Sequence, residues 1–370
     1  MLWPMNSDFD LNQRPLIVIW ETTLSCDLTC FHCRACAQPL RHPLELTTIE
    51  AEKLIDDVAE LRPPIFILTG GDPLKRPDIY DLVRYAVKKQ LHPAMTPSAT
   101  PLLSREAIFA LKEAGLSRLA VSLDGSVPEL HDTFRGVPGS YARTLQSILW
   151  ANEAHLPIQV NTTVSRRNFH DLENMANLLK NFRLVLWSAF FLVPTGRGQM
   201  NDLLSSAEFE AAFSQLYRFA GEMPFKVKTT EAQHYRRFVL QQKRRAGKNG
   251  VAPGPVDGLE SAIPGLLPIN DGKGFVFVSH TGEVFPSGFL PISGGTVRRK
   301  HLTEIYRNSE LFKSLRNSSN LKGKCRRCEF RELCGGSRAR AYAMTGDLFA
   351  EEPCCVYQPL PVVKLQTTTA

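Results

Sequence analysis

The nine cysteines of this 370-residue chain form two groups, one near each end of the sequence. The first group is Cys26, Cys30, Cys33 and Cys36, and the second is Cys325, Cys328, Cys334, Cys354 and Cys355. Closely spaced thiolates are typical ligands of zinc ions and iron–sulfur clusters. The first residues show no basic region followed by an apolar stretch, so we expect a cytoplasmic, reducing environment, where metal ligands are more common than disulfides.

Cys26, Cys30 and Cys33 follow the first apolar run of strand length, at x3 and x2 spacing. Three thiolates on such a loop can bind three irons of a [4Fe–4S] cubane, which leaves the fourth iron without a protein ligand. Two alternatives stay open at this point. Cys36 would complete a ferredoxin-like cluster, or the four thiolates would bind zinc. We expect Cys36 to be a small buried side chain instead.

The segment Glu21–Cys33, which reads ETTLSCDLTCFHC, resembles the signature of the radical S-adenosylmethionine (SAM) superfamily. His32 departs from the aromatic residue that this family usually has before the third cysteine. The resemblance extends over nearly the whole chain, residues 15–359. It implies that Cys26, Cys30 and Cys33 hold a [4Fe–4S] cluster, and that the enzyme cleaves SAM reductively to a 5′-deoxyadenosyl radical.

The same resemblance implies where SAM is bound. Thr69–Pro73 reads TGGDP and is similar to the family's GGEP loop, which binds the methionine amino group; the shorter Asp72 replaces the glutamate. Ser122–Gly125 resembles the family's SLDG segment, and Arg135 matches an arginine that meets the SAM carboxylate. We assign no catalytic acid or base. The expected SAM contacts are Gly70, Gly71, Asp72, Ser98, Ser122, Asp124, Arg135, Asn161, Thr163 and Leu192.

The second cysteine group resembles the auxiliary-cluster domain called SPASM, or its shorter twitch form. The implied ligands of a second [4Fe–4S] cluster are Cys325, Cys328, Cys334 and Cys355. Cys355 is preferred over Cys354 because the family's usual ending is Pro-x-Cys. Ser287 and Arg338 stand where the full pattern has further cysteines, so we expect one auxiliary cluster instead of two. A zinc clamp is the alternative for this group.

These motifs are placed by an alternation of short apolar runs and longer amphipathic ones. The strand candidates are Leu16–Trp20, Ile65–Leu68, Pro93–Thr96, Arg118–Leu123, Ile158–Val164 and Val185–Val193. The helix candidates are Thr48–Leu61, Asp78–Gln90, Arg105–Ala114, Ser140–His155, Phe169–Phe182 and Ser206–Gly221. Six βα units predict a parallel sheet, and therefore an α/β fold of the partial (β/α)6 TIM-barrel type with a small C-terminal cysteine-rich domain. Active-site groups then gather at the carboxyl ends of the strands.

We predict three regions along the chain. They are a partial barrel at 15–223, a connecting segment with a mobile loop at 224–268, and an auxiliary-cluster domain at 269–359. The loop prediction rests on 241–268, which is rich in Lys, Arg, Gly and Pro. In the third region we expect a hairpin that turns at 280–282 and one helix around 302–316.

Two local phrases indicate the substrate. Cys33–Ala37 and Gly335–Ala343 resemble the branch of the family that works in alternative heme synthesis. This resemblance implies an oxidoreductase that alters a propionate of a tetrapyrrole, for which the cations at 234–237, Arg338 and Arg340 are candidate partners. The alternatives are a maturase of a ribosomally made peptide, and a non-catalytic iron–sulfur electron carrier.

Composition limits the other partners. The net charge of +7 is modest for this length, so we do not expect nucleic acid as a partner. No apolar run reaches the roughly 18 residues that a membrane span requires. A small electron donor such as flavodoxin or ferredoxin is the expected protein partner.

Overall fold

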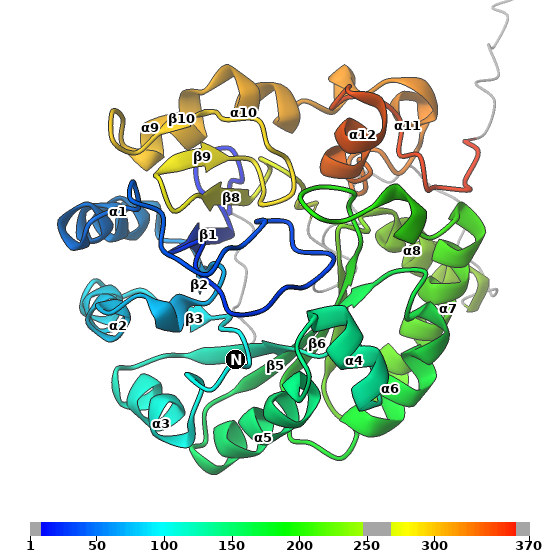
Figure 1. Cartoon of the computed structure of the whole chain (residues 1–370). Helices are drawn as coiled ribbons and strands as arrows, with labels where there is room; N and C mark the ends of the chain where they lie inside the picture. The colour runs from blue at the N-terminus through cyan, green and yellow to red at the C-terminus, as the bar shows by residue number, and fades with distance from the viewer. Residues whose placement is uncertain (1–8, 247–267, 360–370) are drawn as a thin grey trace, which may run out of the picture.

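The computed structural model describes residues 9–246 and 268–359. Its centre is one ten-stranded sheet with the order β10-β9-β8-β1-β2-β3-β4-β5-β6-β7, curved and covered by helices on its outer side (Figure 1). The strands are β1 (Ile17–Glu21), β2 (Ile65–Thr69), β3 (Pro93–Met95), β4 (Arg118–Ser122), β5 (Ile158–Val164), β6 (Leu186–Phe191), β7 (Lys226–Thr230), β8 (Phe275–Val278), β9 (Glu283–Phe285) and β10 (Gly295–Thr296). The α-helices are α1 (Thr48–Leu61), α2 (Ile79–Lys88), α3 (Arg105–Glu113), α4 (Pro128–Arg135), α5 (Ser140–Glu153), α6 (Leu172–Leu179), α7 (Ser206–Glu222), α8 (His234–Ala246), α9 (Leu302–Asn308), α10 (Glu310–Arg316), α11 (Gly323–Arg327) and α12 (Arg338–Thr345).

The core lies between the outer face of the sheet and the helices. Alternate strand residues point to opposite faces, and the outward set, such as Phe66, Leu68 and Val121, is fully buried in the main apolar cluster. Helix α1 starts where the sequence predicts, because Thr47 and Glu50 form a reciprocal capping box. The predicted α/β fold with a parallel sheet is therefore confirmed.

The sheet has more parallel strands than the six predicted. β7 pairs in parallel with β6, and α8 follows it, so the prediction of a connecting segment was wrong for this stretch. The sequence of β7, KVKTT, gives a weak signal because only Val227 packs against the core at this sheet edge. Helix α8 also covers the start of the predicted mobile loop, whose residues 247–267 lie outside the described residues.

The predicted hairpin is confirmed, and it continues the barrel sheet. β8 pairs in parallel with β1 and antiparallel with β9. The single helix predicted around 302–316 is two helices, α9 and α10, interrupted at Ser309. The boundaries 15–223 and 269–359 stay predictions. In the described part of the chain, no helix is long and apolar enough to cross a bilayer.

Candidate active site

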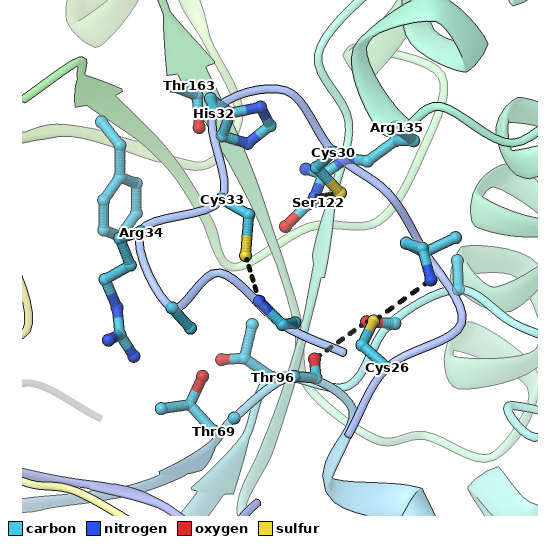
Figure 2. A pocket seen from close by; sticks show the side chains of 18 of the residues that line it. Cys26, Cys30, His32, Cys33, Arg34, Thr69, Thr96, Ser122, Arg135 and Thr163 are labelled. Atoms are coloured by element: carbon cyan, nitrogen blue, oxygen red, sulfur yellow. Dashed lines mark hydrogen bonds between the residues drawn. The ribbon is translucent and has the colours of Figure 1, made fainter. Parts of the chain in front are cut away.

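A cavity of about 190 Å³ lies at the carboxyl ends of the parallel strands, where the cysteine loop after β1 folds over them (Figure 2). Cys26, Cys30 and Cys33 all line this cavity. The expected SAM contacts that also line it are Gly70, Gly71, Ser98, Ser122, Arg135, Thr163 and Leu192. The other three, Asp72, Asp124 and Asn161, do not.

Cys36 lies apart from the other three thiols. It does not line the cavity, and its side chain is exposed, so the expectation that it is buried was wrong. Its backbone is in the left-handed region with φ of 49°, which turns the chain away directly after Cys33. The three-thiol arrangement thus leaves one side of the cavity free of a fourth cysteine.

Several donors already point at the sulfur atoms of the three cysteines. Cys26 Sγ accepts the Leu28 N–H at 3.3 Å, Cys33 Sγ accepts the Ala37 N–H at 3.5 Å, and Cys30 Sγ accepts from Arg135 Nη1 at 3.7 Å. Burial raises the pKa of Cys26 and of Cys30, although Arg135 opposes the shift at Cys30. Iron would reverse this balance, because a metal ion binds the thiolate.

The glycine pair after β2 is required by the cysteine loop itself. A Cβ on Gly70 would lie 2.5 Å from the Thr23 carbonyl oxygen, and one on Gly71 would lie 2.4 Å from that of Ser25. The Gly71 N–H donates to Thr23 O at 2.8 Å, and the Asp72 N–H donates to Ser25 O at 2.6 Å. The two loops are therefore joined backbone to backbone, which fixes the cysteines relative to the strand ends.

The Asp72 side chain is turned away from the cavity. It is fully buried and accepts hydrogen bonds from Leu74 N–H at 3.1 Å and Thr100 Oγ1 at 2.9 Å. Burial raises its pKa to about 6, against the effect of these hydrogen bonds. In this structure the carboxyl group stabilises the loop, and the parts of the motif that face the cavity are the glycines.

Asp124 does not line the cavity itself, but it forms an ion pair with Arg135, which does. Asp124 is fully buried, forms an ion pair with Arg135 Nη2 at 2.5 Å and accepts the Thr163 N–H at 2.7 Å. Arg135 ends α4, a helix that our sequence reading missed. Pro128 in the first turn and Gly136, with φ of 68° just past the end, are the signals that would have found it. Asn161 Oδ1 accepts a hydrogen bond from Gln159 Nε2 at 2.7 Å.

Two further contacts of the cysteine loop were not predicted. In the loop after β6, a Cβ on Gly196 would lie 2.3 Å from Arg34 O, and the Arg197 N–H donates to Cys33 O at 3.0 Å. Arg34 lines the cavity and pairs with the buried carboxylate of Glu21 at 3.1 Å. Burial opposes the ionisation of Glu21, but Arg34 and a hydrogen bond with His280 outweigh it and lower the pKa. The available signal in the sequence was the glycine at 196 itself, whose φ is 61° in the structure.

The second cysteine group surrounds a separate and much smaller space. Cys325, Cys328, Cys334 and Cys355 all line a cavity of about 20 Å³. Cys354 does not line it and points to Leu204 O, 4.0 Å from its sulfur. This placement agrees with the choice of Cys355 as the fourth thiol.

Neither cysteine group has the geometry of a site for one metal ion. Over residues 9–246 and 268–359, no three His, Cys, Asp or Glu side chains gather closely enough to bind a single ion. In a [4Fe–4S] cluster each thiolate binds a different iron, so its ligands lie further apart than those of one ion.

The cations that we expected to meet propionates are held inside the protein. Arg340 is fully buried and pairs with Glu352 at 3.2 Å, while Arg338 donates to Leu348 O and Ala350 O at 3.0 and 2.7 Å. Arg236 donates to two backbone carbonyls, Arg237 pairs with Glu210, and His234 is fully buried. The expectation was wrong because the four arginines bind backbone carbonyls or acids around the second cysteine group, and His234 is fully buried.

Comparisons with known proteins place this architecture in context. The sequence profile described as the Radical SAM superfamily matches residues 20–179. A protein of Methanosarcina barkeri named AdoMet-dependent heme synthase is 42% identical over 349 residues, which cover 94% of this chain and 98% of the relative. One of the same name from Nitratidesulfovibrio vulgaris is 41% identical and covers 93% and 92%. The crystal structure of Streptococcus suis SuiB bound to S-adenosylmethionine has the same fold, with a TM-score of 0.72 at 12% identity, covering 93% of this chain and 78% of SuiB.

Proposed function

Because the chain belongs to the radical SAM superfamily and is therefore an enzyme, we propose that it oxidises propionate side chains of an iron-bound tetrapyrrole. The observation that carries the proposal is the cavity in which Cys26, Cys30 and Cys33 face the glycine loop while Cys36 lies outside it. When bound there, an incompletely ligated cluster and SAM supply a 5′-deoxyadenosyl radical that takes a hydrogen atom from the substrate. The substrate class is supported by the 42% identity to a protein named AdoMet-dependent heme synthase.

Different residues of the cavity suit different parts of SAM. Arg135 is oriented by Asp124 and has a buried Nε without a hydrogen-bond partner in the described residues, so it is suited to a carboxylate. Ser98, Ser122 and Thr163 present hydroxyl groups to the cavity, which suits ribose and methionine. Leu192 forms part of the apolar wall on which a purine can pack.

The oxidation requires an electron acceptor. Loss of one hydrogen atom, one electron and CO2 converts a propionate into a vinyl group, and the electron must leave the substrate. We assign Cys325, Cys328, Cys334 and Cys355 to a second [4Fe–4S] cluster, which would supply that acceptor. A reduced flavodoxin or ferredoxin is the proposed source of the electron that starts each cycle.

The test uses reconstituted, reduced full-length protein with SAM and iron-coproporphyrin III under anaerobic conditions. We expect 5′-deoxyadenosine together with a porphyrin whose mass has fallen by CO2 and two hydrogen atoms per modified propionate. Formation of 5′-deoxyadenosine with no change in the porphyrin would point to the peptide-maturase alternative. No 5′-deoxyadenosine at all would leave only the electron carrier.

A further inference from the structure

The inner face of the barrel sheet is less fully packed than the outer face at β2 and β5. In a closed TIM barrel, inward side chains fill the interior in layers. Here the inward residues of β2 and β5, which include Ile65, Ile67 and Gln159, are only partly buried, whereas their outward neighbours are fully buried. Ser122 and Thr163, which line the cavity of the cysteine loop, belong to the same inward set. The interior of the sheet therefore adjoins the candidate active site.

Lys228 lies on this inner face, in the same register row as the active site. Ser122 pairs with Asn161, Asn161 with Ser188, and Ser188 with Lys228. Register partners on neighbouring strands point to the same side of a sheet. The neighbouring inward position of β7, Thr230, confirms this direction, because its Oγ1 lies 3.3 Å from Ser188 Oγ.

Arg118 is a second cation on the inner face. It begins β4, where it pairs with the inward Ala94 of β3, and its Nη1 donates to Gln159 Oε1 at 3.5 Å. The Lys228 side chain is exposed to solvent, while desolvation by the surrounding strands and the positive charge of Arg118 lower its pKa. Among the described inward strand positions the carboxylates are Glu21, which already pairs with Arg34 and His280, and Glu283 of β9, which accepts from Ser293 and lies near the opposite end of the strand order from β7. Lys226, two positions before Lys228, adds a third cation to this face, and no ion pair among the described residues neutralises Lys228 or Arg118.

We propose that Lys228 and Arg118 bind carboxylate groups of the substrate inside the barrel. An anion placed between two like charges turns their repulsion into attraction. A tetrapyrrole with several propionates offers carboxylates besides the one that reacts, and these fix the ring relative to the cavity. The proposal rests on the proposed function and identifies which residues of the interior would anchor that substrate class.

The experiment titrates the reconstituted full chain with iron-coproporphyrin III and follows the Soret band. Lys228→Gln should raise Kd by about tenfold, whereas Lys228→Arg, which keeps the charge, should restore most of the affinity. Lys53→Gln, which removes an equal charge from the outer surface of α1, should leave Kd within about twofold. The tetramethyl ester of the porphyrin, which has no carboxylates, should bind the wild type and Lys228→Gln alike. Iron content and the melting temperature report whether each variant folds.

The outcomes separate the two proposals. If the wild type binds the porphyrin and Lys228→Gln binds it equally well, the anchoring role of Lys228 is refuted and the proposed function is untouched. Loss of affinity in Lys228→Gln for the acid and the ester alike also refutes it, since the effect is then not on carboxylates. If the wild type does not bind iron-coproporphyrin III at all, the proposed function is refuted and this inference with it.

Discussion

The two cysteine regions of this molecule place the same side chain in different surroundings. The N-terminal thiols line a cavity of about 190 Å³ together with hydroxyl groups, glycines and an arginine, and the fourth nearby cysteine is turned outward. Four of the five C-terminal thiols surround a cavity of only about 20 Å³. Three thiols with space beside them suit a cluster that binds a ligand, whereas four thiols without space suit a cluster that only exchanges electrons.

The two regions also differ in the contacts that hold them in place. The cysteine loop is held mainly by backbone contacts, such as those from Gly71 and Arg197, which leave side chains free to face the cavity. The second region is held by buried charges that are already paired, with Glu352 accepting from Arg340 and from the Ser337 N–H. Polar hydroxyl groups therefore line the first cavity, whereas the acids and cations of the second region pair mainly with one another.

The largest expected effect tests whether the N-terminal cluster has an iron without a cysteine ligand. Cys30→Ala should reduce 5′-deoxyadenosine formation by more than about a thousandfold, because the reaction requires the cluster. Cys36→Ala should stay within about twofold of the wild type, since its thiol lies outside the cavity. Both rates can be measured by chromatography of the nucleoside product. If Cys36→Ala were as inactive as Cys30→Ala, the N-terminal cluster would be closed and the contrast would disappear.

The next prediction tests which cysteine is the fourth ligand of the proposed C-terminal cluster. Cys355→Ala should lower the iron content of reconstituted protein from about eight to about four per chain, because the loss of one of four ligands destabilises a cubane. Cys354→Ala should keep about eight, since its sulfur points to Leu204 O instead of the shared cavity. Iron and sulfide analysis gives both values. The reverse pattern would assign the fourth ligand to Cys354.

A smaller effect is expected where the cysteine loop meets the glycine loop. Gly71→Ala should lower the free energy of unfolding by about 1–3 kcal/mol, because its Cβ would lie 2.4 Å from Ser25 O. Gly221→Ala is the matched control: no atom lies within 4 Å of its added Cβ in α7, so it should raise stability by about 0.5–1 kcal/mol. Denaturant titration measures both. A neutral Gly71→Ala would show that the two loops can separate easily.

The effect that is smallest at neutral pH concerns acid sensitivity near the first region. Burial lowers the pKa of His131 to about 3, and its Nδ1 accepts the Asp124 N–H at 3.0 Å. Below the ordinary value of 6.5 the unfolded chain binds a proton that the folded chain refuses, so stability falls as the pH falls from 6.5 toward 3. His131→Asn should make this slope shallower by up to about 1.4 kcal/mol per pH unit.

Unfolding titrations at several pH values measure that slope. His234, whose pKa burial likewise lowers to about 3, belongs to the second region and should keep part of the acid sensitivity in the variant. An unchanged slope in His131→Asn would show that His131 is protonated in the folded chain.

Local features of the sequence determined most of the fold. Thr48–Leu61 and Ile158–Val164 were predicted with the bounds that the structure has, since helix capping and apolar periodicity act over a few residues. The elements that the sequence did not predict lie at the sheet edge or lack a strong apolar stripe. β7 has one residue that packs on the core, and α4 is marked chiefly by Pro128 and Gly136.

Cysteine spacing by itself determined which residues are candidates for clusters, but only the tertiary structure decided which side chains face a ligand. Asp72 carries a charge next to the glycine loop and is nevertheless turned into a hydrogen-bond network with Thr100. Arg340 was expected to be a free cation and is neutralised by Glu352, whereas Lys228 gave no signal and forms no ion pair within residues 9–246 and 268–359. Sequence specifies the type and spacing of a charge. Its function depends on whether a partner far along the chain neutralises it, and this is decided by the packing of distant elements.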